Sequence, residues 1–125
     1  MNRYPEFSEL LGKTIDHISG AEPGSERIVF TTGYDEQFSL YHERDCCEGV
    51  SVEDIIGDVE DLIGSPILLA EEVTSDVNPK DVKKDYQDSF TWTFYKLATI
   101  KGYVTIRWYG ESNGYYSESV SFSKS

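Results

Sequence analysis

The stretch from Ser51 to Ile63 constrains the fold more than any other part of this sequence. Its apolar residues recur at the three- and four-residue spacing of a helix stripe: Val52, Ile55, Ile56, Val59, Leu62 and Ile63. Ser51 suits the cap of a first turn, with Asp54 three residues later as its capping-box partner, and Gly64 with Pro66 marks an end. The pattern predicts one amphipathic helix whose other face is acidic.

Segments on both sides of this helix have the alternation and turn signals of strands. The expected strands cover residues 13–19, 27–31 and 38–42 before the helix, and 67–73, 90–100, 103–109 and 115–122 after it. Lys101-Gly102 and Asn113-Gly114 are signals for tight turns. The order predicts an α+β fold in one domain, 1–125, with an antiparallel β-sheet of about six to seven strands packed on one amphipathic helix.

The charge of the chain is concentrated in its middle. The formal net charge is -12, and residues 35–88 carry 16 acidic and 4 basic side chains. Such a surface repels phosphates, so we expect neither direct nucleic-acid binding nor binding to an anionic membrane. No segment has the roughly 20 consecutive apolar residues of a membrane span, and the first residues lack the apolar core of a signal peptide. We therefore expect a cytoplasmic location.

The acidic face of the expected helix is a candidate surface for a partner. Its residues are Glu53, Asp54, Asp58, Glu60 and Asp61. One interpretation is a face that only keeps the protein soluble; the other is a face that meets a protein with a basic surface.

An aromatic face with one cation is a candidate ligand site. Alternation along the strand 103–109 places Tyr103, Arg107 and Tyr109 on one face, opposite the core residues Val104, Ile106 and Trp108. Asn113 and Tyr115 follow in the chain and could adjoin this face. It could stack a planar, nucleotide-like ligand, or it could be ordinary surface packing.

The densest group of reactive side chains runs from His42 to Glu48. A metal site here would draw on His42, Asp45, one of Cys46 and Cys47, and Glu71 or Glu72. The spacing matches no common metal motif, and no hydrolase signature surrounds a cysteine paired with His42 or His17. The simpler interpretation is structural, with His42 partly buried and both cysteines reduced, because adjacent residues are too close for an ordinary disulfide. We assign no cofactor, metal or catalytic residue.

Several short motifs resemble a small domain family of unknown function that is found in phages and bacteria. They are Leu11-Gly12-Lys13-Thr14-Ile15, Asp45-Cys46-Cys47-Glu48, Ile56-Gly57-Asp58 with Asp61-Leu62, Ala70-Glu71-Glu72, Phe94-Tyr95-Lys96, Arg107-Trp108 and Asn113-Gly114-Tyr115-Tyr116. The resemblance covers most of the chain and implies a phage or prophage accessory protein, without assigning catalytic residues.

Together these features favour a non-enzymatic, phage-type accessory protein that binds a host protein through its acidic face, with counter-defence as one setting. The first alternative is a protein that sequesters a small nucleotide-like ligand on the aromatic face. The second is a metal-dependent enzyme centred on His42 and residues 45–48. The partner, the ligand and the oligomeric state are not encoded in any recognisable pattern.

Overall fold

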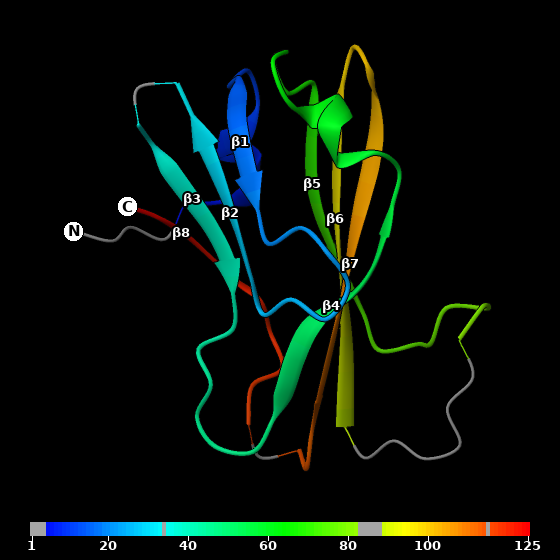
Figure 1. Ribbon diagram of the computed structural model, residues 1–125. Coiled ribbons are helices and arrows are strands. Elements are labelled where there is room, and N and C mark those ends of the chain that lie inside the picture. The colour runs from blue at the N-terminus through cyan, green and yellow to red at the C-terminus, as the bar shows by residue number, and fades with distance from the viewer. Residues whose placement is uncertain (1–4, 34, 83–88, 115) are drawn as a thin grey trace.

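The computed structural model describes residues 5–33, 35–82, 89–114 and 116–125. Two antiparallel four-stranded sheets lie face to face, as Figure 1 shows. Sheet 1 has the order β1-β2-β3-β8, and sheet 2 has the order β4-β7-β6-β5. The strands are β1 Ile15–Ser19, β2 Arg27–Thr32, β3 Gln37–Tyr41, β4 Gly49–Ile56, β5 Leu69–Ser75, β6 Ser89–Thr99, β7 Gly102–Ser112 and β8 Ser121–Lys124. Two single-turn 3-10 helices complete the described elements, η1 Phe7–Leu10 and η2 Val59–Leu62.

The prediction of an α+β fold with one amphipathic helix is wrong. Residues 49–56 form strand β4, which pairs with β7 from Gly49 opposite Glu111 to Ile56 opposite Thr105. Only Val59–Leu62 is helical, and Asp58 caps that turn by accepting a hydrogen bond from the Glu60 N–H at 3.0 Å. The described part of the chain is therefore a β-sandwich.

The prediction failed because the residues from 50 to 56 fit the pattern of a strand as well as that of a helix. Val50 and Val52 alternate with Ser51, and the segment is rich in β-branched residues, which favour strands. Gly57 then has a φ of +107°, which no helix residue adopts. Of the expected helix stripe, Val52 and Leu62 are buried, whereas Ile56 is 52 % exposed.

The strand predictions outside this segment are largely confirmed. The hairpin around Lys101 and Gly102 is present, with β6 and β7 paired from Ser89 opposite Ser112 to Thr99 opposite Gly102. The last strand is shorter than expected, since β8 begins only at Ser121. No helix in the described residues is long and apolar enough to cross a membrane.

The core lies between the two sheets. Sheet 1 contributes Ile15, Ile28, Phe30, Phe38, Leu40 and Phe122, and sheet 2 contributes Val52, Tyr95, Leu97, Val104, Ile106 and Trp108. Phe7 from η1 lies against Tyr95 and Phe122, with ring centroids 4.6 and 5.2 Å away. Phe7 of η1 therefore contacts residues of both sheets, and the outer face of sheet 2 carries Arg107, Tyr103 and Tyr109.

Candidate functional site

The five acids expected on one helix face separate into two groups. Glu53 and Asp54 lie on β4 beside Arg107 of β7, whereas Asp58, Glu60 and Asp61 surround η2. The two groups are separate because Glu53 and Asp54 belong to the extended strand β4, whereas the other three acids follow its end at Ile56. The two groups must therefore be considered separately.

Arg107 is held by carboxylates. Its side chain is 7 % exposed; its Nε donates to Glu53 Oε2 at 2.6 Å, and its two terminal nitrogens donate to Asp81 at 3.1 and 3.2 Å. Burial lowers the pKa of Arg107, but the hydrogen bonds to Glu53 and Asp81 outweigh it and leave the pKa raised. The hydrogen bonds from Arg107 lower the pKa of Asp81. These contacts weigh against the hypothesis that Arg107 offers its guanidinium to a ligand.

The same contacts fasten residues 76–82 over Trp92. Trp92 is fully buried although it lies on the outer face of sheet 2, and its indole N–H donates to Asn78 Oδ1 at 3.0 Å. Arg107 lies over the Trp92 ring at 5.4 Å. The ring of Tyr109, which is directly opposite Trp92 in the pairing of β6 with β7, lies 4.6 Å from it. Asp81 and Asn78, which the sequence analysis did not single out, therefore give this region its structure.

The expected ligand residues do not all come together. Tyr103 is 51 % exposed near the beginning of β7, whereas Tyr109 is half-buried near its end. Tyr109 and Asn113 both line an open hollow of about 520 Å³ next to Cys47. Arg107 is not among its lining residues, and Tyr115 lies outside the described residues. The ligand-binding role of these residues stays a prediction.

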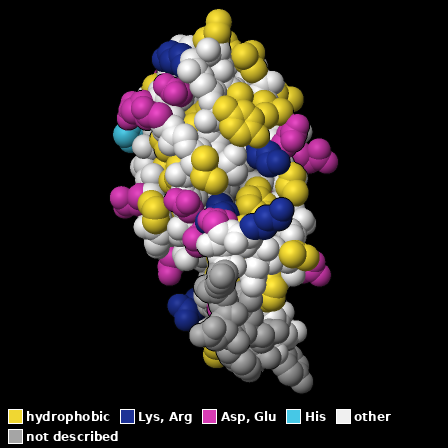
Figure 2. Space-filling model, turned by 90° about the vertical axis from the view of Figure 1, so that its right-hand side faces the viewer, with side chains coloured by type: hydrophobic (Ala, Val, Ile, Leu, Met, Phe, Trp, Pro, Cys, Tyr) yellow, Lys and Arg dark blue, Asp and Glu magenta, His cyan; other side chains and the backbone are white. Residues whose placement is uncertain are grey.

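Exposed hydrophobic side chains gather at the end of the sandwich that carries η2. They are Ile56, Leu68, Ile100 and Tyr103, which are 52, 63, 84 and 51 % exposed. Several contacts bring their segments together: Leu68 N–H donates to Ala98 O at 2.8 Å, and Lys101 Nζ donates to Ile63 O at 2.5 Å. Figure 2, which views the molecule from the right of Figure 1, shows hydrophobic side chains over the upper part of this face, with acidic side chains to their left and right. We call these four residues with Asp58, Glu60 and Asp61 the η2-end surface.

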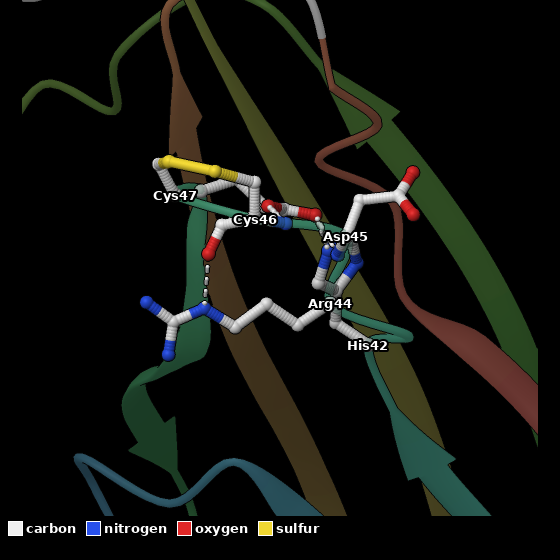
Figure 3. Close-up of a disulfide and its surroundings, with 6 residues drawn as sticks. His42, Arg44, Asp45, Cys46 and Cys47 are labelled. Atoms are coloured by element: carbon white, nitrogen blue, oxygen red, sulfur yellow. Dashed lines mark hydrogen bonds and ion pairs between the residues drawn. A yellow bond between two sulfur atoms is a disulfide. The ribbon is translucent and has the colours of Figure 1, made fainter.

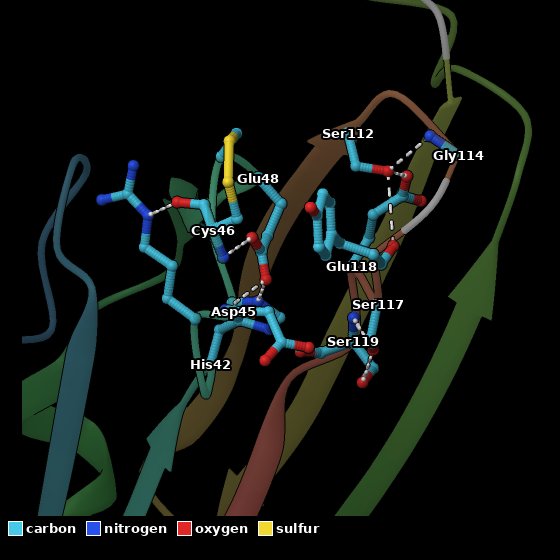
Figure 4. Close-up of polar contacts among 12 residues, drawn as sticks. His42, Asp45, Cys46, Glu48, Ser112, Gly114, Ser117, Glu118 and Ser119 are labelled. Atoms are coloured by element: carbon cyan, nitrogen blue, oxygen red, sulfur yellow. Dashed lines mark hydrogen bonds and ion pairs between the residues drawn. A yellow bond between two sulfur atoms is a disulfide. The ribbon is translucent and has the colours of Figure 1, made fainter.

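His42 and Glu48 form a buried polar pair between β3 and β4. His42 Nε2 lies 2.7 Å from Glu48 Oε2, and Nδ1 lies 2.7 Å from the carbonyl oxygen of Ser119 (Figure 4). Backbone N–H groups of Asp45 and Cys46 also donate to the Glu48 carboxylate. Hydrogen bonds lower the pKa of Glu48 from its ordinary value of 4.5 to about 2. The largest effect comes from the Asp45 N–H, followed by His42 and the Cys46 N–H.

This geometry uses both nitrogens of the His42 ring. The Ser119 carbonyl oxygen lies at hydrogen-bond distance from one ring nitrogen, and the Glu48 carboxylate lies at hydrogen-bond distance from the other. Both ring nitrogens therefore already face a protein group, which is the arrangement of a structural histidine. Among the described residues, no group of three or more His, Cys, Asp or Glu side chains is arranged to hold a metal ion.

The prediction of two reduced cysteines is wrong for this structure. Cys46 and Cys47 are joined by a disulfide with an S–S distance of 2.05 Å (Figure 3). The bend at these residues brings both sulfurs to the same side of the chain, although the two Cα atoms are only 3.7 Å apart. Neither sulfur is available as a nucleophilic thiolate in this state.

A second buried carboxylate lies nearby and was not expected from the sequence. Glu118 is 9 % exposed, and it accepts hydrogen bonds from Thr91 Oγ1 at 2.9 Å and Ser112 Oγ at 2.5 Å. Ser112 Oγ also accepts from the Gly114 N–H at 3.0 Å, which fixes the turn after β7 (Figure 4). These contacts tie the loop before β8 to sheet 2, which is a structural role.

A protein-family model described as a domain of unknown function, DUF7448, matches residues 8–122. The chain belongs to this family. That result confirms the resemblance to a small domain family of unknown function. No curated protein and no solved structure matches this DUF7448 domain. Its function must therefore be argued from its own surfaces.

Proposed function

We propose that this DUF7448 domain is a non-catalytic binding protein that engages a partner protein with a basic surface through its η2-end surface. The observation that carries the proposal is the grouping of Ile56, Leu68, Ile100 and Tyr103 beside three acids. Exposure of four large apolar side chains to water at one end of a small domain is unfavourable. Their burial against another surface lowers the free energy and so favours binding. The acids around them would add selectivity for a basic partner.

The acids of η2 are better placed for this role than those of β4. Glu53 and Asp54 face Arg107, which they share with Asp81, so its guanidinium offsets part of their charge. Asp58 and Glu60 are exposed, and Lys101 donates to the carbonyl of Ile63 at the same end of the sandwich. The η2 turn therefore keeps a negative field that can steer a basic partner at low salt.

The biological setting is part of the proposal. The resemblance to a family found in phages and bacteria supports a phage-type accessory protein that acts in the cytoplasm of a host cell. The partner would then be a host protein, and counter-defence is the role for which a small acidic binding protein is suited. This part depends on the resemblance, whereas the binding surface depends on the described contacts.

The two alternatives have different support. Sequestration of a small nucleotide-like ligand is favoured by the hollow that Tyr109 and Asn113 line, and calorimetric titration with nucleotides tests it directly. A metal-dependent enzyme centred on His42 is disfavoured because the Ser119 carbonyl and Glu48 occupy both ring nitrogens.

Affinity capture from bacterial lysate with matched variants tests the proposed function. Ile100→Ser and Glu60→Lys change the η2-end surface. Val77→Ser and Glu22→Lys are the controls, because each replaces an exposed apolar or acidic side chain elsewhere by the same serine or lysine. We expect the first pair to reduce the recovery of a specific partner by tenfold or more in combination, and the second pair to leave it unchanged. Equal recovery with both pairs, or equal loss, would overturn the proposal.

A further inference from the structure

Strand β5 leaves one edge of sheet 2 open. It is the last strand in the order β4-β7-β6-β5, and within the described residues no strand pairs with its other side. The residues Glu71 to Thr74 are all exposed, although η1 contacts β5. The N–H and C=O groups along such an edge can pair with another extended chain.

The charges on β5 select which chain can pair with it. Glu71 and Glu72 are adjacent in the middle of the exposed part. A second copy of β5 would bring carboxylates opposite carboxylates, and like charges in directly opposed positions are destabilising. A strand with Lys or Arg at these positions would gain from the same geometry. The edge is therefore protected against self-association while it stays open to a basic segment.

A cleft on the inner side of β5 offers a place for one basic side chain. It has a volume of about 420 Å³, and its lining includes Glu6, Phe7, Ala70, Glu72 and Phe122. The lining therefore combines two carboxylates with two aromatic rings and an alanine. A Lys or Arg side chain has the matching shape, since its apolar stem can cover the rings while its charged end reaches the carboxylates.

Tyr95 lies behind this cleft, next to two of the residues that line it. Tyr95 is fully buried, and its oxygen has no hydrogen bond within normal limits. It lies directly opposite Glu72 in the pairing of β5 with β6, and its ring contacts Phe7, so it borders two lining residues. Burial raises the pKa of Tyr95, and the carboxylate of Glu72 raises it further, which keeps the phenol neutral. A neutral phenol can donate a hydrogen bond to Glu72, which would help to position that carboxylate at the cleft.

We propose that an extended, basic segment of a partner protein adds to β5 as a fifth strand of sheet 2 and places a Lys or Arg side chain in this cleft. The residue opposite Glu72 shares the inner face, so its side chain enters the cleft. The neighbouring residues, opposite Glu71 and Val73, lie on the outer face, where a basic and an apolar residue fit best. The site is separate from the η2-end surface and does not depend on it.

A designed peptide tests this proposal without knowledge of the natural partner. The probe is the acetylated and amidated hexapeptide Thr-Val-Lys-Lys-Val-Thr, whose palindromic sequence suits either strand direction. Two further versions carry N-methyl groups on one or the other alternate set of residues, and a fourth has Glu in place of both Lys. Titration of ¹⁵N-labelled protein followed by NMR gives the affinity and locates the residues that respond.

We expect saturable binding of the Lys peptide with shifts centred on Glu71 to Ser75. One of the two N-methylated peptides should bind at least about tenfold more weakly, because only one alternate set of N–H groups faces β5. Glu72→Lys should weaken the Lys peptide about tenfold or more and strengthen the Glu peptide, and Glu72→Gln should weaken the Lys peptide less. Glu60→Lys, the matched change at the η2-end surface, should leave the affinity unchanged.

Three results would overturn the proposal. One is equal binding by both N-methylated peptides and the parent, which would indicate charge attraction without strand pairing. Another is equal weakening by Glu60→Lys and Glu72→Lys when circular dichroism shows both variants folded. The third is the absence of saturation at millimolar peptide. None of these results bears on the capture experiment, so the two proposals can fail separately.

Discussion

Replacement of Arg107 by Met is the most informative test of how sheet 2 is held together. Arg107 makes three hydrogen bonds to carboxylates: one to Glu53 at 2.6 Å and two to Asp81 at 3.2 and 3.1 Å. Met retains an apolar stem of similar length, so Arg107→Met removes the charge and the hydrogen bonds with little change in packing. It also leaves the carboxylates of Glu53, Asp54 and Asp81 without their shared cation.

The magnitude follows from the exposure of each partner. The hydrogen bond to Glu53, which is 33 % exposed, should contribute near the lower end of the roughly 1.5–3 kcal/mol range of charged hydrogen bonds. The guanidinium over Trp92 adds about 0.5–1 kcal/mol. Asp81 is 65 % exposed, and water screens its attraction, so we assign it no separate figure. We therefore expect Arg107→Met to reduce the free energy of unfolding by about 2–3 kcal/mol.

Equilibrium unfolding in urea, followed by tryptophan fluorescence and circular dichroism, measures this loss. Arg27→Met is the matched control, because Arg27 is exposed and lies over the Tyr41 ring at 4.5 Å. We expect a loss of no more than about 1 kcal/mol for the control. A loss below about 0.5 kcal/mol for Arg107→Met, or one equal to that of the control, would refute the structural role of Arg107.

Three other outcomes follow from burial, charge and backbone geometry. Ile106→Ala should reduce the free energy of unfolding by about 2–5 kcal/mol because Ile106 is fully buried, whereas Ile56→Ala should cost less than about 1 kcal/mol; urea unfolding measures both. The folded pKa of Glu48, about 2, lies below its ordinary value of 4.5, so its contribution to stability is complete above pH 4.5 and is lost as the pH falls toward 2. The fall in urea midpoint between pH 6 and pH 3 should therefore be smaller in Glu48→Gln, and an equal fall would contradict the assignment. Gly57→Ala should destabilise the protein by about 1–3 kcal/mol, more than Gly24→Ala, in thermal unfolding.

The strands could be predicted because their signals are local. Alternation and turn residues identified the hairpin of β6 and β7, and Trp108 was correctly placed on the core side of β7. The two-layer arrangement could not be predicted in the same way, because it depends on which edges meet. No local pattern shows that β4 pairs with β7 rather than with a neighbour in sequence, or that β8 returns to β3.

The site predictions failed where a side chain is satisfied by a residue far along the chain. Alternation correctly placed Arg107 opposite the core face of β7, but its exposure depends on Asp81, which is 26 residues away. His42 likewise depends on Ser119, which is 77 residues away. A sequence shows the face on which a side chain lies, but not which loop covers that face. The exposed hydrophobics Leu68 and Ile100 carried no motif at all.

The sign of the effect at Gly57 separates the two interpretations of residues 51–63. In a helix interior, replacing Gly by Ala stabilises by about 1 kcal/mol, because Ala has the higher helix propensity. In the β-sandwich, Gly57 has a φ of +107°, and an added Cβ would clash with the carbonyl oxygen of Tyr103. Gly24 has a similar φ of +89° but open space around its Cβ, so Gly24→Ala reports the backbone cost alone. A larger loss at Gly57 than at Gly24 would show that β4 ends against β7 as described. A gain in stability at Gly57 would mean that the local helix pattern determines the structure of this segment after all.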